Sequence, residues 1–418
     1  MRYTLLSFLC VATVIAYVQR SALAVPAKTI EGELGLRPQD MGLVMSVWYW
    51  AYALGQLPAG WLADRIGSKP ALVLFAVLWS ALTGIVGLAG GFVGLMLLWG
   101  LMGCAQAGIF PCCTKAIGST FPRTGQAFAS GMLACCMSLG AAIAQKLTGA
   151  LLGPLTWQEI FALYAVPGLA WALVFALVVP RPEPPAPPPE TDAPDDWAAL
   201  PPPVASATSP APWWKLVTDA QMQLLCAQQF LRASAVAFFY TWFPRFLQET
   251  KGLNSGEAGA LAAWPPLAGM CGGLLGGVFS DWLLRRTGNA RLSRQGMATA
   301  AMVVCAAAGL AAYLATDAVT VVVLLCVAGF FGMVGGVSGY SVAIAFGGKR
   351  VATVFATMNM SGNVGAAVFP LAVGFLVAST GDWNNALLLF AGLFAADAVC
   401  WVLLNPKGTL FDDTDPPR

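Results

Sequence analysis

Long apolar runs alternate with short polar segments along almost the whole chain. Each run is long enough to cross a hydrocarbon core of roughly 30 Å, which takes about 20 residues in an α-helix. Hydropathy therefore predicts an all-α membrane protein with twelve transmembrane helices. The expected spans are 4–27, 40–63, 70–90, 92–121, 125–150, 157–180, 222–248, 256–283, 295–315, 318–346, 351–378 and 383–405.

The middle of the chain breaks this pattern. Residues 181–212 are rich in proline and carry several acidic side chains, such as Glu183 and Asp192. Such a composition cannot build a core, so we expect an extended linker. The predicted organisation is an N-terminal six-helix bundle over 1–180, a Pro-rich linker over 181–221, a C-terminal six-helix bundle over 222–405 and a tail over 406–418.

A charged turn follows the second predicted helix and recurs after the eighth. The copy at 60–69 contains Asp64 and Arg65, and the copy at 277–286 contains Asp281 and Arg285. The glycine and the aspartate of the two copies align at one constant offset, which indicates two related halves. These charges close their helices at a membrane face, so we expect them to act as a gate.

The composition agrees with a protein whose main partner is the lipid bilayer. Of the 418 residues, 58% are hydrophobic and 10% are charged, against roughly 25% charged residues in soluble domains. Basic residues collect on one set of helix ends, including those of both charged turns. Because basic loops stay in the cytoplasm, we expect both termini and the linker there, with the protein in the inner membrane if it is bacterial.

Several classes of function are disfavoured by residues that the sequence lacks. Histidine is absent, and the 11 cysteines lie in apolar runs without the spacing of metal ligands. The chain has no glycine-rich nucleotide-binding loop, and its net charge of +2 does not indicate a nucleic-acid partner. We therefore expect no enzyme activity, no cofactor and no metal.

Two arginines inside predicted spans are the main candidates for a binding site, because a charge inside a membrane is costly. Arg20 lies past the middle of the first span and shares a helical face with Tyr17. Arg232 lies roughly 15 Å from the inner end of the seventh span. Two guanidinium groups facing one cavity would bind a carboxylate through paired hydrogen bonds. Either arginine could instead be structural and pair with a carbonyl or an acid.

Neutral polar residues support the hypothesis of a cavity. They lie on the first, second, fourth and eleventh spans: Gln19, Tyr52, Gln56, Gln106, Asn359 and Asn363. Several share one helical face, so we expect them to bond to substrate hydroxyl groups. The alternative for each is a hydrogen bond that joins neighbouring helices.

The two charged turns resemble the signature of the major facilitator superfamily and its echo in the second half of the chain. Shorter motifs resemble the anion:cation symporter branch of that family: Tyr17-Val-Gln-Arg20, the stretch 52–60, Phe110-Pro111, Phe121-Pro122 and Thr241-Trp242-Phe243-Pro244. The resemblance implies two six-helix bundles that give alternating access to a central site. It also implies transport of sugar acids or other organic anions.

The chain departs from that branch at positions that carry acids in its members. Gln19 stands where an Asp commonly precedes the arginine, and Gln106 stands where an acid is common in the fourth helix. Neither glutamine can titrate, so we expect facilitated diffusion, exchange or coupling to another ion in place of the usual proton route. The acid expected within a span is Asp397, on the last helix.

Together these features predict a monomeric secondary transporter of a small organic anion, a carboxylate of the sugar-acid kind. One alternative is a transporter of a neutral or cationic solute in which the arginines are structural. A second is a membrane sensor or scaffold that transports nothing. The linker is short and acidic and does not resemble a partner domain, which disfavours the scaffold.

Overall fold

The computed structural model describes residues 2–121, 123–179, 218–347 and 351–405, and the regular elements in these ranges are helices. Most of the predicted linker, from 180 to 217, and the predicted tail at 406–418 lie outside the described residues. The first half comprises α1 (Arg2–Ser21), α2 (Ala27–Leu34), α3 (Pro38–Ile66), α4 (Ser68–Val86), α5 (Phe92–Gln106), α6 (Ile109–Thr120), α7 (Arg123–Leu151) and α8 (Trp157–Val178).

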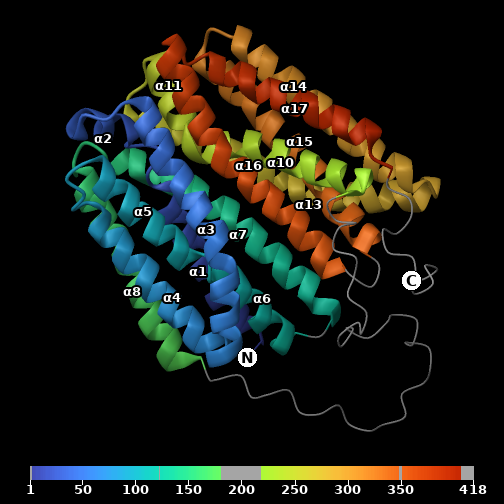
Figure 1. Cartoon of the computed structure of the whole chain (residues 1–418), viewed down its shortest axis with the longest axis horizontal. Coiled ribbons are helices and arrows are strands. Elements are labelled where there is room, and N and C mark those ends of the chain that lie inside the picture. Colours follow the sequence, from blue (N-terminus) through green and yellow to red (C-terminus); the bar gives the residue numbers. More distant parts are fainter. Residues whose placement is uncertain (1, 122, 180–217, 348–350, 406–418) are drawn as a thin grey trace.

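The second half comprises a similar set of helices, with one π-helical turn, η2. Its elements are α10 (Ala220–Thr241), α11 (Phe243–Lys251), α12 (Ser255–Ala262), α13 (Trp264–Thr287), η2 (Arg291–Gly296), α14 (Met297–Leu314), α15 (Ala318–Gly347), α16 (Val351–Thr380) and α17 (Asn385–Leu403). In Figure 1 the two halves lie side by side, and the helices of each half pack mainly against one another. The short helices α2 and α11 lie at one end of the molecule, opposite the N-terminus.

Three of the predicted spans are interrupted in the structure. The span 92–121 divides into α5 and α6, 222–248 into α10 and α11, and 256–283 into α12 and α13. Proline explains the last two breaks, because Pro244 and Pro265 stand in the first turn of the following helix. Proline lacks the N–H that a continuous helix would use, so the chain starts a new helix at that point.

Ten helical segments among the described residues are long and apolar enough to cross a membrane. Two helices that match predicted spans, α3 and α10, are not among them. The reason lies in their side chains, because α3 carries Tyr52 and Gln56 and α10 carries Gln228 and Arg232. Both helices that fall short therefore carry candidate site residues.

The two halves approach closely where α3 crosses α16 and where α7 crosses α12. A Cβ atom added at Gly42 would lie 2.6 Å from the carbonyl oxygen of Pro370, and one at Gly149 would lie 2.6 Å from that of Ser255. Glycine is therefore required at both crossings, as is common where helices pack inside a membrane. Because Gly149 is near the end of α7 and Ser255 starts α12, this contact lies close to α11.

Candidate functional site

A small cavity lies between the halves, next to the last turn of α1. Arg20 lines it together with residues from α3, α5 and α10, among them Trp48, Tyr49, Trp99 and Tyr240. The wall is thus aromatic on several sides, with one cation in it. The composition of the lining is that of a small-molecule site, although in this conformation the cavity of about 20 Å³ holds no more than a water-sized group.

The guanidinium group of Arg20 is surrounded by aromatic rings. Its Cζ atom lies 4.1 Å from the ring centre of Trp48, 4.8 Å from Tyr17, 5.1 Å from Tyr49 and 5.8 Å from Tyr52. Its Nη1 atom donates a hydrogen bond of 3.1 Å to the Tyr17 hydroxyl. No carboxylate among the described residues forms an ion pair with Arg20. Cation–π contacts hold the group in place but leave its charge without a counter-ion, which suits it to bind an anion.

Trp48 lines this cavity and carries a hydrogen-bond donor that the described part of the protein does not use. Its indole Nε1 is buried and has no acceptor within the described part of the chain. The ring stacks on Tyr52, with centroids 5.0 Å apart and an angle of 15° between the planes, so its orientation is fixed. Since an unpaired buried donor is costly, a ligand oxygen at this place would be stabilised. Sequence reasoning did not select Trp48, although it stands one turn before Tyr52 on α3.

Gln19 and Gln106 bond within the first half. Gln19 Nε2 donates to the carbonyl oxygen of Tyr164 at 2.7 Å and to Ser80 Oγ at 3.3 Å. Gln106 Nε2 donates to the carbonyl oxygen of Ala16 at 3.0 Å. Both side chains are buried, and neither lines the cavity of Arg20. In this structure they join helices, which is the alternative that the sequence left open.

Arg232 is not brought together with Arg20. It is buried inside the second half, where its Nη2 donates to Gln229 Oε1 at 2.7 Å and its Nη1 lies against Gly336 of α15. A different part of the same helix reaches the cavity, because Tyr240 and Thr241 line it. The expected pair of arginines around one carboxylate is therefore absent from this conformation of the described residues.

The remaining predicted polar residues lie on α3 and α16. Gln56 is half-buried on α3, one turn from Tyr52. Asn359 and Asn363 are half-buried on α16, and neither lines the cavity of Arg20. Of the expected substrate contacts, the structure thus gathers Arg20, Tyr17 and Tyr52 at one place.

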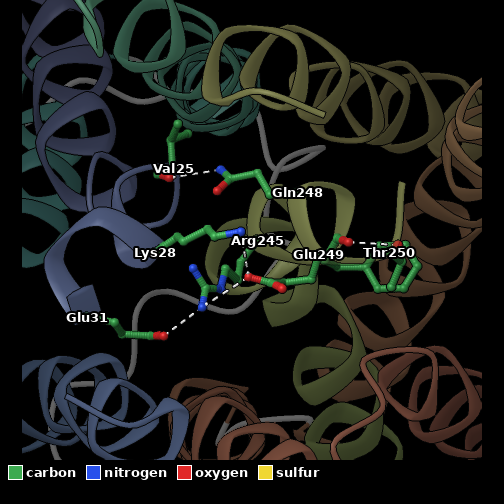
Figure 2. A network of polar contacts seen from close by, with 8 residues as sticks. Val25, Lys28, Glu31, Arg245, Gln248, Glu249 and Thr250 are labelled. Carbon is green, nitrogen blue, oxygen red and sulfur yellow. Dashed lines mark hydrogen bonds and ion pairs between the residues drawn. The ribbon is translucent and has the colours of Figure 1, made fainter. Parts of the chain in front are cut away.

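A second polar cluster joins the two halves at the α2–α11 end, and we call it the latch. It consists of Lys28 and Glu31 on α2 with Arg245, Gln248 and Glu249 on α11 (Figure 2). Arg245 Nη2 lies 2.8 Å from Glu31 Oε2, and Lys28 Nζ lies 3.1 Å from Glu249 Oε1. Gln248 Nε2 also donates to the carbonyl oxygen of Val25 at 3.1 Å.

The central pair of the latch is buried, whereas its outer pair is not. The side chains of Arg245 and Glu31 are 9% and 6% exposed, while that of Lys28 is 53% exposed. Burial raises the pKa of Glu31 to about 7, although the neighbouring Arg245 lowers it. Sequence reasoning missed the latch. The available signal was Arg245, one of few basic residues at the helix ends that are expected to face away from the cytoplasm. It accompanies the acids of 27–34.

The charged turns lie at the other end and make a different set of contacts. Asp64 Oδ1 pairs with Lys115 Nζ at 2.8 Å, and both residues belong to the first half. Arg65 lies over the ring of Trp61, as Arg286 lies over the ring of Trp282 in the second half. Asp281 and Arg285 are exposed near the end of α13. Among the described residues, ion pairs between the halves occur only in the latch.

Comparison with known proteins assigns most of the chain to one family. The family model described as Major Facilitator Superfamily matches residues 9–315. A protein named "Probable galactarate/D-glucarate transporter" from Bacillus subtilis is 30% identical over 96% of this chain and 91% of its own length. A "Probable sulfoacetate transporter" from Cupriavidus necator is 28% identical over 98% of this chain and 95% of its own length. A "Hexuronate transporter" from Bacillus subtilis is also 28% identical, over 96% of each chain.

Solved structures share the fold at lower sequence identity. A crystal structure of a bacterial homologue of the human lysosomal transporter Spinster, in an inward-facing and occupied conformation, has a TM-score of 0.78. It is 17% identical in sequence and covers 96% of both chains. At this identity the likeness concerns the arrangement of helices alone.

Proposed function

The chain belongs to the Major Facilitator Superfamily, and on that premise we propose that it carries a small organic anion of the sugar-acid kind across the membrane. It is an integral membrane protein that crosses the bilayer several times. The observation that supports an anionic substrate is Arg20, a cation without a counter-ion in an aromatic cavity between the halves. Curated relatives named for sugar acids and sulfoacetate support the same class of substrate.

The chemistry of the cavity suggests how such an anion binds. A carboxylate would accept two hydrogen bonds from the planar guanidinium group of Arg20, and the surrounding rings would exclude water. The indole N–H of Trp48 would donate to another oxygen of the substrate. Tyr17, Tyr52 and Gln56 would bond to hydroxyl groups, whereas Gln19 and Gln106 would fix the helices around the cavity.

We place twelve crossings in the membrane, with both termini in the cytoplasm. The two crossings beyond the ten apolar segments are α3 and α10, which tolerate polar residues because those residues face protein and not lipid. The helices of 1–180 and 222–405 then form two related bundles joined by a cytoplasmic linker at 181–221, with a cytoplasmic tail at 406–418. We expect one chain to transport alone, because the cavity is built entirely from its two halves.

In this arrangement the latch seals the non-cytoplasmic end of the molecule. Alternating access requires that it opens while contacts form at the other end, where Asp64, Arg65, Asp281 and Arg285 lie. The conformation described here would then release substrate towards the cytoplasm. This assignment follows from the position of the ion pairs between the halves.

A transporter of a neutral or cationic solute is the second candidate. It would need an acid beside Arg20 or a central cavity without a charge, and among the described residues the cavity at Arg20 has neither feature. A scaffold that transports nothing would leave the uncompensated charge of Arg20 unexplained. We therefore favour the organic anion.

A thermal-shift screen of the purified protein tests this function. The panel consists of D-glucarate, galactarate, D-galactonate, a hexuronate and sulfoacetate, with neutral D-glucose and a cationic amine as controls. Because a ligand stabilises the state that binds it, at least one organic anion should raise the Tm. A rise with the neutral or the cationic solute, and with none of the anions, would contradict the proposal.

A further inference from the structure

The most isolated buried acid in the described structure is Asp397, on α17. Its side chain is 0% exposed, and neither of its carboxyl oxygens has a hydrogen-bond partner among the described residues. It lies on the same buried face of the helix as Phe394 and Trp401, which are also 0% exposed. An ionised carboxylate without partners in such a place would be very costly, so the group is stable here as the neutral acid.

The cation that acts on Asp397 is Arg232 of α10. The two groups form no ion pair in this conformation, because Arg232 instead bonds to Gln229. Its Nε atom is buried and has no acceptor within the described part of the chain. The other titratable groups near the acid are two thiols, Cys305 of α14 and Cys400 of α17. No further charged group among the described residues acts on it.

This arrangement provides two states for the pair. With a proton on Asp397, the acid is neutral and Arg232 keeps its bond to Gln229, as in this structure. Without the proton, the carboxylate would attract Arg232, whose unpartnered Nε is available for a bond. Loss or gain of the proton would therefore shift the guanidinium group and the helix that carries it.

That helix also reaches the substrate cavity. Tyr240 and Thr241 line the cavity from α10, and Tyr240 lies two turns beyond Arg232, or about 12 Å along the axis. A shift of α10 at Arg232 is therefore transmitted to the cavity wall by a rigid element. α10 leads directly into α11, which holds Arg245 of the latch. The same shift would therefore also move Arg245 relative to Glu31.

We propose that Asp397 is the proton-binding residue of this transporter and that Arg232 positions it, so that protons are coupled to the anion through α10. This proposal rests on the proposed transport function. In each cycle the carboxylate binds one proton to give the neutral acid, and later releases it to water on the opposite side of the membrane. The proposal replaces the expectation of transport without protons, which followed from Gln19 and Gln106 although Asp397 was expected within the last span.

Proteoliposomes that contain the full chain and take up labelled D-glucarate provide the test. With the membrane potential clamped, an inward proton gradient should drive uphill uptake by the wild type. Asp397→Asn, which resembles the neutral acid, should lose this uphill uptake but retain counterflow exchange, which needs no net proton movement. Asp382→Asn removes an exposed loop carboxylate and should keep both activities.

A spectroscopic measurement gives a second readout that does not depend on transport. Infrared spectra of purified Glu31→Gln at neutral pH should show the carbonyl band of a protonated buried carboxyl group, and the same protein with Asp397→Asn added should lack it. The Glu31→Gln background is needed because the pKa of buried Glu31 is itself raised to about 7. If Asp397→Asn folds poorly, Arg232→Gln replaces it, because without the cation the acid should keep its proton and uphill uptake should again be lost. In the Glu31→Gln background, the proteins with and without Arg232→Gln should then both contain the carboxyl band.

The outcomes separate this proposal from the proposed function. Counterflow of the anion without gradient-driven uptake in the wild type would overturn the role of Asp397 and leave the transport function intact. Uphill uptake retained by Asp397→Asn, or an infrared band that this substitution does not remove, would also overturn it. Failure of counterflow with every organic anion would instead remove the transport function, while the infrared band would still decide whether Asp397 holds a proton.

Discussion

Arg20 and Arg232 lie on the corresponding first helices of the two halves, yet their surroundings differ in a way that separates two tasks. Arg20 lines a cavity between the halves, where aromatic rings hold it and no acid neutralises it. Arg232 is buried within one half, bonds to Gln229 and is the charged group that acts on Asp397. A buried cation without an acid is suited to bind an external anion, whereas one close to an acid is suited to respond to its protonation.

The largest expected effect is at Arg20. Arg20→Lys replaces a planar group with two parallel donors by a point charge, so affinity for the anion should fall by about tenfold to hundredfold, as charge-assisted hydrogen bonds contribute about 1.5–3 kcal/mol. Arg232→Lys is the matched variant and should bind the anion nearly as tightly as the wild type. Calorimetric titration of both proteins measures the affinity. Equal losses of affinity in the two variants would show that Arg20 and Arg232 do not have separate tasks.

The second effect concerns pH and the latch. Burial raises the pKa of Glu31 from 4.5 to about 7, so the sealed conformation binds a proton more tightly than a state in which Glu31 faces water. Its contribution to stability is therefore complete below about pH 4.5 and is lost as the pH rises through about 7. The Tm of the wild type should fall by several degrees across this window relative to Glu31→Gln.

Thermal unfolding at a series of pH values measures this difference. Asp382→Asn, which changes an exposed loop acid, should follow the wild type. Parallel pH profiles for the wild type and Glu31→Gln would show that the latch does not titrate in this range.

A smaller effect is expected at Trp48. Trp48→Phe keeps an aromatic ring beside Arg20 but removes the buried indole N–H. Affinity for the anion should fall by about twofold to tenfold, because a neutral hydrogen bond contributes about 0.5–1.5 kcal/mol. Trp99→Phe, elsewhere in the cavity wall, is the comparison, and calorimetric titration would show whether the loss is specific to the indole donor.

The smallest effect is expected in the charged turns. The Asp64–Lys115 pair is exposed and lies within one half, so Asp64→Asn should leave binding unchanged and slow turnover by at most about fivefold. Asp281→Asn should slow it less, since Asp281 forms no ion pair with another described residue. Initial rates of exchange in proteoliposomes distinguish the two, and unchanged rates in both would remove these turns from the transport cycle.

The sequence predicted those features that depend on local pattern. Apolar length located most of the helices, and charge inside a span identified Arg20 and its neighbour Tyr17. The sequence could not show that Gln19, the residue before Arg20, bonds to helices of the first half and not to a substrate. Adjacent residues on a helix point in different directions, so the position of Arg20 does not fix that of Gln19. Nor could the sequence place Glu31 against Arg245, since that contact joins distant segments and depends on how the two halves meet.

Counterflow of labelled D-glucarate in proteoliposomes tests the central claim most directly, because it requires both binding at Arg20 and passage across the membrane. The wild type should concentrate the labelled anion transiently inside vesicles preloaded with the unlabelled one, and Arg20→Gln should not. Accumulation that persists in Arg20→Gln, or counterflow of a neutral sugar in place of the anion, would contradict this account of the cavity.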